Sequence, residues 1–144
     1  MKKKEFHRLA RAVIRSGEHI LLAKAEGWQN SFLPGGHVEL GEGAETALLR
    51  ELSEELGVNG KVIHFLGDFE HSWQHDDTEH FELTHVFEVV IESEEIMSQE
   101  PHLRFFWADP ADFDNLDLQP YPLIDFLRNK QLPVSEWHST LETN

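Results

Sequence analysis

Three glutamates lie close together in the stretch RELSEELG, residues 50–57. They are Glu51, Glu54 and Glu55, and their i, i+3, i+4 spacing makes them neighbours on the surface of a helix. Like charges repel one another at this spacing, and a bound cation would remove that cost. Carboxylate oxygens with no histidine or cysteine among them favour Mg²⁺ or Mn²⁺ over Zn²⁺. The plain alternative is a solvated acidic helix face, which the spacing alone does not exclude.

The helix that carries these acids is predicted over residues 44–56, with Gly57 as a left-handed cap. On a helical projection the stripe that faces the core consists of Leu48, Leu49, Leu52 and Leu56. The acids lie beside this stripe, and the gaps between them hold only Ala44 and Ala47. Such small side chains predict that something can approach this face of the helix closely.

The charge of the chain restricts its partners. Twelve basic residues stand against 27 acidic ones, which gives a formal charge of −15. We therefore expect no nucleic-acid partner, and a phosphorylated substrate would need a divalent cation between its phosphates and the carboxylates. The 144 residues contain no cysteine, no run of membrane length and no signal peptide in MKKKEF. These features predict one cytoplasmic domain without a membrane partner.

A mixture of strands and helices must position the acids. Residues 8–25 contain two β-capable runs separated by a Ser-Gly-Glu tripeptide, which indicates a hairpin, and residues 31–40 contain a short strand. Further strands are predicted at residues 61–69, 81–92 and 103–109, with a polar connection at 70–80. A second helix begins near Pro122, and residues 131–144 form a tail that is expected to fray. The pattern favours a mixed sheet flanked by helices.

The stretch GHVELGEGAETALLRELSEELGV, from Gly36 to Val58, resembles the Nudix box, G-x5-E-x7-R-E-U-x-E-E-x-G-U, where U is aliphatic. Every position agrees; the matching residues are Gly36, Glu42, Arg50, Glu51, Leu52, Glu54, Glu55, Gly57 and Val58. The LPGG before the box, and the aromatic-rich strand and final helix after it, are also similar to the family. The chain is thus identified as a member of the Nudix hydrolase family over most of its length.

This resemblance implies an α/β fold, the Nudix α/β/α sandwich around a mixed β-sheet, as a single domain over residues 1–144. It implies hydrolysis, dependent on Mg²⁺ or Mn²⁺, of a nucleoside diphosphate linked to a group X by attack of water on phosphorus. The substrate would be a nucleotide sugar, ADP-ribose, a dinucleoside polyphosphate or a modified nucleoside triphosphate. The subfamily markers past the box, a proline or a tyrosine, are missing from SWQHDD, so X and the base stay open.

Two other activities occur on this architecture. A nucleotide-sensing regulator that does not hydrolyse its ligand is the alternative function, although such proteins usually lose box glutamates and this chain keeps them. A prenyl diphosphate isomerase would need a catalytic cysteine, which is absent. Whether the chain forms a homodimer is left open.

Within the box, the resemblance implies the metal ligands Gly36, Glu51, Glu54 and Glu55. Gly35 and Gly36 are expected to form a turn whose backbone groups, the Gly36 carbonyl among them, face the metal. Arg50 is implied to orient a carboxylate rather than to form an ordinary surface ion pair. Glu42 lies ahead of the helix N-terminus, where a carboxylate is favoured electrostatically, and is interpreted as structural.

The general base is open among several acids. Glu54 and Glu55 can serve within the box, and Glu100, just before the strand at 103–109, is the candidate outside it. Glu79 and Glu82 are further alternatives, and each outside acid can equally be a solvated surface residue.

A series of histidines surrounds the predicted connection at 70–80; its members are His71, His75, His80 and His85. No cysteine joins them, and His80 and His85 have opposite parity on a strand, which argues against zinc. An exposed connection without a special role is the main interpretation. The alternative is a loop that contacts substrate, with Trp73 stacked on a base, and Trp28 is interpreted as a packing residue.

Overall fold

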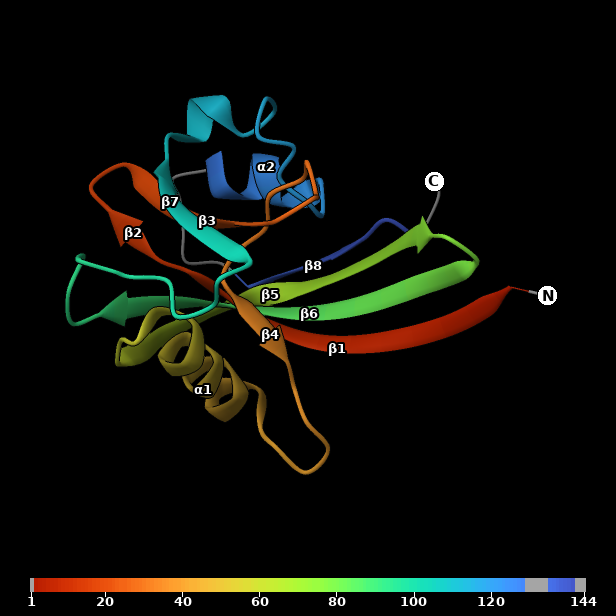
Figure 1. Cartoon of the computed structure of the whole chain (residues 1–144), viewed down its shortest axis with the longest axis horizontal. Helices are drawn as coiled ribbons and strands as arrows, with labels where there is room; N and C mark the ends of the chain where they lie inside the picture. The colour runs from red at the N-terminus through yellow and green to blue at the C-terminus, as the bar shows by residue number, and fades with distance from the viewer. Residues whose placement is uncertain (1, 129–134, 142–144) are drawn as a thin grey trace.

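Five strands form a mixed sheet in the computed structural model, which describes residues 2–128 and 135–141 (Figure 1). These strands are β1 (Lys3–Val13), β4 (Gly35–His37), β5 (Gly60–His75), β6 (Thr78–Ile91) and β8 (Glu136–Ser139). Their order is β4-β1-β6-β5-β8; β1 runs parallel to β6 and β5 parallel to β8, and the other neighbours are antiparallel. The long strand β1 therefore lies between β4, which comes from the box, and the central strand β6.

A second, smaller sheet packs beside the first. Its strands are β2 (Arg15–Ser16), β3 (His19–Ala25) and β7 (Leu103–Ala108), all antiparallel. The predicted hairpin in residues 8–25 is confirmed as β2 and β3, with Gly17 in a left-handed conformation at the turn. A 3₁₀ turn, η1 (Pro110–Asp112), follows β7.

Two helices cover opposite sides of the strands, α1 (Ala44–Leu56) and α2 (Pro122–Arg128) (Figure 1). The side chains of β1 alternate between two core clusters. Ala10 and Ala12 join the cluster that contains the leucines of α1, whereas Val13 joins the cluster that contains those of α2. The predicted fold class, an α/β/α sandwich around a mixed sheet, is confirmed. None of the helices in the described part of the chain is long and apolar enough to cross a membrane.

The predicted connection at 70–80 is wrong, because β5 and β6 continue as a hairpin through it. Residues 70–75 pair in register with residues 78–83. The reversal needs only Asp76 and Asp77, and Asp76 takes the left-handed conformation, with φ 54°, that aspartate tolerates in two-residue turns. The histidines of this segment therefore project from strands at fixed positions.

The C-terminal tail is also more ordered than predicted. Residues 136–139 form β8, which adds to the edge of β5 in parallel register. Its partner residue Gly67 lets the two backbones approach, since a Cβ there would collide with the backbone of Glu136. Residues 131–134 and 142–144 of the predicted tail lie outside the described residues.

Candidate functional site

Helix α1 begins and ends as predicted, with Gly57 at φ 66° closing it through a hydrogen bond to the Ser53 carbonyl. The stripe of Leu48, Leu52 and Leu56 is buried, and Leu49 at its margin is half-buried. Ala47 is fully buried as well, and α1 packs against β1 and β4. The small side chain of Ala47 therefore allows α1 to pack closely against other parts of the chain. The prediction that an external group can approach this face of the helix is wrong at Ala47.

Gly35 and Gly36 do not form the predicted turn; both lie in β4, paired with Arg11 and Ala10 of β1. Gly35 has φ 143°, and a Cβ there would collide with the Ala10 carbonyl. A Cβ at Gly36 would lie 2.6 Å from Cδ of Glu51. The two glycines thus serve close packing: one lets β4 approach β1, and the other leaves room for a box carboxylate.

Arg50 holds the acids of the box in place. Its Nε and Nη2 donate to the two oxygens of Glu42 at 2.8 and 3.0 Å. Its Nη1 donates to Oε1 of Glu51 at 3.0 Å and approaches Glu54 at 3.4 Å, and Nη2 also donates to the His37 carbonyl at 3.2 Å. The orienting role expected for Arg50 fits these contacts.

Glu42 works through Arg50 rather than through the helix terminus. Its carboxylate makes no capping hydrogen bond to α1, whose N-cap is Gly43, and it accepts instead from the Glu39 backbone N–H at 3.1 Å. The hydrogen bonds from Arg50, and then the one from Glu39, lower the pKa of Glu42 to about 2. Glu42 is therefore a structural anchor of the loop, as expected, but for a different physical reason.

Glu55 lies in the least solvated part of the acidic cluster. Burial, together with the negative charges of Glu51 and Glu100, raises its pKa to about 7, while Arg11 and a hydrogen bond from the Gly35 backbone act in the opposite direction. Glu54, by contrast, is exposed over 55% of its side chain. The structure thus brings both Glu51 and the outside candidate Glu100 within electrostatic reach of Glu55.

The loop that carries Glu100 is attached to the end of α1. The Gln99 backbone N–H donates to the Glu55 carbonyl at 2.7 Å, and Ser98 holds the Glu100 carbonyl with its hydroxyl at 2.8 Å. Of the other acids considered, Glu79 lies on β6 opposite Gln74 and Lys4, and nothing in the described contacts connects it to the box. Glu82 faces a different feature, a pocket.

This donor set suits a divalent cation such as Mg²⁺. The cluster contains only oxygen ligands, and a cation would relieve the repulsion that Glu51 and Glu100 exert on Glu55. Arg50 donates to Glu51 at 3.0 Å and approaches Glu54 at 3.4 Å, so the same guanidinium orients two of the box carboxylates. The residues thus fit the ion.

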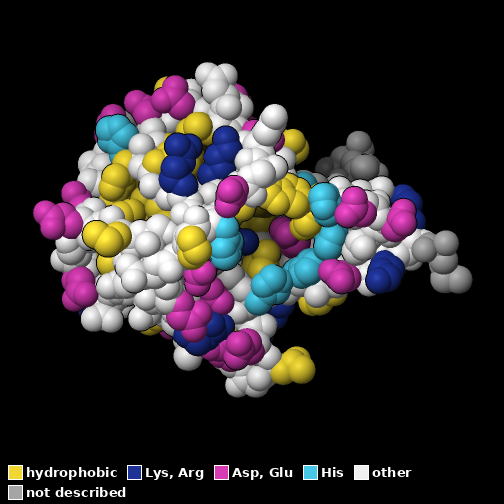
Figure 2. Space-filling view, viewed as in Figure 1, with side chains coloured by type: hydrophobic (Ala, Val, Ile, Leu, Met, Phe, Trp, Pro, Cys, Tyr) yellow, Lys and Arg dark blue, Asp and Glu magenta, His cyan; other side chains and the backbone are white. Residues whose placement is uncertain are grey.

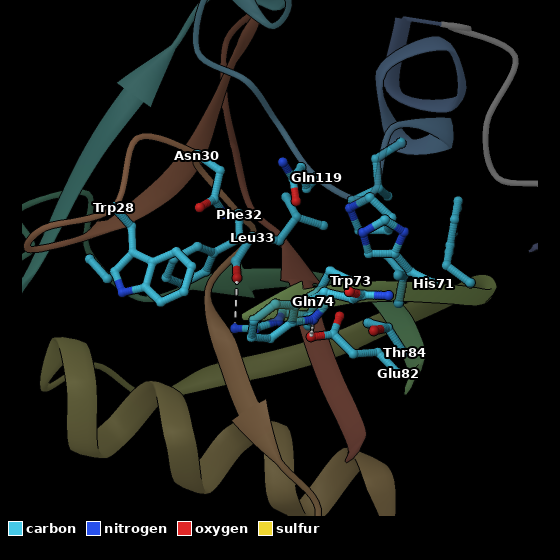
Figure 3. Close-up of a pocket in the computed structure, with 16 residues that line it drawn as sticks. Trp28, Asn30, Phe32, Leu33, His71, Trp73, Gln74, Glu82, Thr84 and Gln119 are labelled. Carbon is cyan, nitrogen blue, oxygen red and sulfur yellow. Dashed lines mark hydrogen bonds between the residues drawn. The ribbon is translucent and has the colours of Figure 1, made fainter. Parts of the chain in front are cut away.

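A pocket of about 390 Å³ opens on the other side of the strands from α1 (Figure 3). Aromatic rings of Trp28, Phe32 and Trp73 line it, and the indoles of Trp28 and Trp73 meet edge to face at 5.9 Å. Trp28 packs against Trp73 and His75, in agreement with its predicted packing role, and yet 42% of this residue is exposed. Both tryptophans therefore present ring surface to whatever enters the pocket.

Polar groups in the pocket are available to a ligand. His71 is buried; its Nδ1 lies 3.0 Å from the Thr140 hydroxyl, but Nε2 has no hydrogen-bond partner among the residues that the structure describes. Burial lowers the pKa of His71, so the ring is neutral at neutral pH. The charge of Glu82 and the side chain of Gln119 act in the opposite direction. Gln119 nevertheless makes no hydrogen bond of ordinary geometry to Nε2. An unpaired buried nitrogen costs roughly 1–3 kcal/mol, which a ligand could recover.

Arg11 connects the pocket with the acidic cluster, and the sequence analysis missed it. It lines the pocket, lies 5.0 Å over the Phe32 ring and donates to the Leu33 carbonyl at 3.1 Å. Burial lowers its pKa, and the nearby charges of Glu82, Glu55 and Glu51 oppose that change. The available signal was an arginine inside the otherwise apolar run LARAVI, residues 9–14.

Comparison with known proteins agrees with this architecture. The NUDIX domain family matches residues 5–128. Over 35 residues the chain is 54% identical to the putative mutator protein MutT4 of Mycobacterium tuberculosis (strain CDC 1551 / Oshkosh), a stretch that covers 24% of this chain and 14% of that protein.

Solved structures resemble the fold over nearly the whole chain. A mutator MutT protein from Bacillus halodurans gives a TM-score of 0.70 at 20% identity, covering 92% of this chain and 89% of that one. A UDP-X diphosphatase gives a TM-score of 0.69 at 21% identity, covering 93% of this chain and 67% of that one. At these identities the likeness concerns the fold.

Proposed function

Because the chain belongs to the NUDIX domain family, we propose that it is a pyrophosphohydrolase that uses Mg²⁺ or Mn²⁺ to cleave a nucleoside diphosphate linked to a group X. One observation carries the proposal: Arg11 lies within electrostatic reach of the box acids and also lines an aromatic pocket in which, among the described residues, Nε2 of His71 is unpaired. A substrate whose base or X occupies the pocket would thereby bring its phosphates to the acids.

The cation would be held by Glu51, Glu54, Glu55 and the Gly36 carbonyl. When bound, it would neutralise phosphate charge and make the phosphorus more electrophilic. Arg50 keeps Glu51 and Glu42 in fixed orientations, so that little conformational entropy is lost when the ion arrives.

Arg11 is suited to bind a phosphate oxygen. Within the described part of the chain its guanidinium makes a hydrogen bond only to the Leu33 carbonyl, so its other N–H groups remain free to donate. Its partial burial strengthens any such contact, because the local dielectric is lower than that of water.

The proton of the attacking water would pass to a carboxylate at this cluster. Glu54, Glu55 and Glu100 are the candidates. Glu100 stays among them because its charge reaches Glu55 and its loop is fastened to α1. Single substitutions at the three positions, compared by their pH–rate profiles, would separate the base from the residues that only hold the ion.

The activity can be tested by offering the metal-loaded protein four substrate classes: nucleotide sugars, ADP-ribose, dinucleoside polyphosphates and oxidised nucleoside triphosphates. We expect release of a nucleoside monophosphate or pyrophosphate from at least one class, and none after chelation of divalent ions. Arg11→Gln should raise KM for the substrate that is cleaved. Binding of a nucleotide without turnover on any of them would favour the sensing regulator.

A further inference from the structure

A cluster of histidines and a glutamate lies outside the box, at the ends of β1 and β6 far from α1. Figure 2 shows histidine side chains in a row on this face, beside the hollow. Glu5 pairs directly with His80 across the parallel strands, and His7 lies two residues beyond Glu5 on the same face. Among the described residues this is the group whose metal-capable atoms approach within 4.8 Å of one another.

The three atoms form a triangle with two nearly equal sides and one shorter side. Nε2 of His7 lies 2.8 Å from Nδ1 of His80, and Oε2 of Glu5 lies 3.6 Å from the former and 3.5 Å from the latter. A triangle with these sides fits on a circle of about 1.9 Å radius. An ion slightly out of its plane would therefore lie about 2.0–2.1 Å from all three atoms, the usual distance of zinc from imidazole and carboxylate ligands.

The ring of His7 is held through its other nitrogen. Its Nδ1 lies 2.9 Å from Nε2 of His37, and in the tautomer in which Nδ1 donates there, Nε2 of His7 keeps a lone pair for an ion. A ligating histidine whose other nitrogen is bonded in this way is characteristic of metal sites. His80 is held from its other side by Trp73, stacked at 3.9 Å between ring centroids.

We propose that Glu5, His7 and His80 form a second metal site, selective for a transition metal ion of the Zn²⁺ class and separate from the oxygen-only box. Two imidazoles and one carboxylate with an open fourth position suit Zn²⁺, and Mg²⁺ does not compete well for imidazole nitrogen. The site is open to an incoming ion, because the side chain of Glu5 is 53% exposed, whereas those of His7 and His80 are 20% and 12% exposed.

The position of this site links it to the pocket. Trp73 stacks on His80, lines the pocket and donates through Nε1 to Glu82 at 2.8 Å. An ion bound to His80 would fix the imidazole of His80. The Trp73 indole stacked on it, which forms one wall of the pocket, would then also be held in a fixed orientation. The proposal does not depend on hydrolysis, since it concerns ion binding alone.

Isothermal titration of the untagged, metal-stripped chain with Zn²⁺ in millimolar Mg²⁺ tests the site. We expect one Zn²⁺ per chain, bound more than about tenfold more weakly by His7→Gln, His80→Gln and Glu5→Gln. His19→Gln, which changes an exposed histidine elsewhere, should bind as the wild type does. If His80→Gln does not fold, the other two variants still decide the result.

Two further readouts locate the ion. Co²⁺ bound here should give the intense visible absorption of a four-coordinate nitrogen-containing site, and Ni²⁺ should quench part of the tryptophan emission through Trp73. Both signals should persist in a Glu51→Gln, Glu54→Gln double variant. Loss of Zn²⁺ binding in that double variant, or unchanged binding in His7→Gln and His80→Gln, would overturn the proposal. Absence of Zn²⁺ binding would show a hydrogen-bonded row of side chains only.

Discussion

The Arg50 guanidinium holds the Glu42 carboxylate with two hydrogen bonds, Nε to Oε2 at 2.8 Å and Nη2 to Oε1 at 3.0 Å. The same guanidinium reaches Glu51 at 3.0 Å and the His37 carbonyl at 3.2 Å. Three separated parts of the box, namely the end of β4, the loop before α1 and the second turn of the helix, are therefore held by one cation. This arrangement explains why the box requires residues that are distant in sequence.

Glu42→Gln should lower stability in a pH-dependent way. The pKa of Glu42 is about 2 in the folded protein and near 4.5 when unfolded, so its ionised form stabilises the fold above pH 4.5. That contribution is lost as the pH falls toward 2. Denaturant titrations of both proteins between pH 7 and 3 should give a difference that shrinks on acidification. If the difference in unfolding free energy between the two proteins did not change with pH, the charge of Glu42 would not be the cause of the destabilisation.

Glu54→Gln and Glu55→Gln should each reduce turnover by at least about a hundredfold, since both are proposed to hold the ion or to accept the proton. Their effects on stability should differ. Glu54 is exposed, so its replacement should leave the melting temperature unchanged. Glu55 is partly buried beside Glu51 and Glu100, so removing its charge should raise the melting temperature in the absence of divalent ions.

Glu45→Gln is the matched control for these two variants, because Glu45 is an exposed acid on the same helix. It should hydrolyse substrate at the wild-type rate. Wild-type turnover in both Glu54→Gln and Glu55→Gln would refute the roles given to them.

Gly36→Ala should mainly reduce activity, whereas Gly35→Ala should mainly reduce folding stability. A methyl group at Gly36 meets the end of the Glu51 side chain and no backbone atom, so we expect about 10–100-fold weaker metal-dependent activity with little change in stability. At Gly35 the methyl group meets the rigid Ala10 carbonyl at φ 143°, which should cost about 1–3 kcal/mol or more of folding free energy. Thermal melts and kcat/KM of the pair would check this; the reverse assignment of effects would contradict the described packing.

Leu52→Ala should destabilise the protein by about 2–5 kcal/mol, because Leu52 is fully buried between α1 and the sheet. Leu40→Ala provides the contrast: Leu40 is fully exposed in the loop before α1, and its truncation should change stability by less than about 0.5 kcal/mol. Urea denaturation of the two variants measures both values. Equal midpoints would show that burial of Leu52 does not hold α1 against the sheet.

The sequence predicted those parts of the fold whose signals are local. The leucine period and Gly57 set both ends of α1, and Pro122 marked the start of α2. The hairpin at residues 70–80 could not be recognised in the same way, because its strands are polar on both faces and the turn is two aspartates rather than an Asn-Gly pair.

Features that depend on distant contacts escaped prediction. Gly67 lets β8 approach β5, and Gly35 takes φ 143° where β4 lies close against β1. The parallel pairing of β1 with β6 places Arg11 beside the pocket and, separately, brings Glu5 and His7 next to His80. No local sequence pattern reveals the register of this pairing. The box acids, by contrast, are neighbours in sequence, and their assignment needed no long-range information.

The separation of the acids from the pocket, with Arg11 between them, bears on how the sequence of such a protein can change in evolution. The carboxylates proposed to be catalytic stand mainly on α1, whereas the pocket is built largely from β5, β6, the segment between β3 and β4 and the segment before α2, with Arg11 between the two groups. If the proposed function holds, substitutions at Trp28, His71 or Gln119 would alter which group X is accepted without disturbing Arg50 and its carboxylates. Selection could then change the range of substrates and preserve the chemistry, since the two properties would be encoded by separate sets of residues.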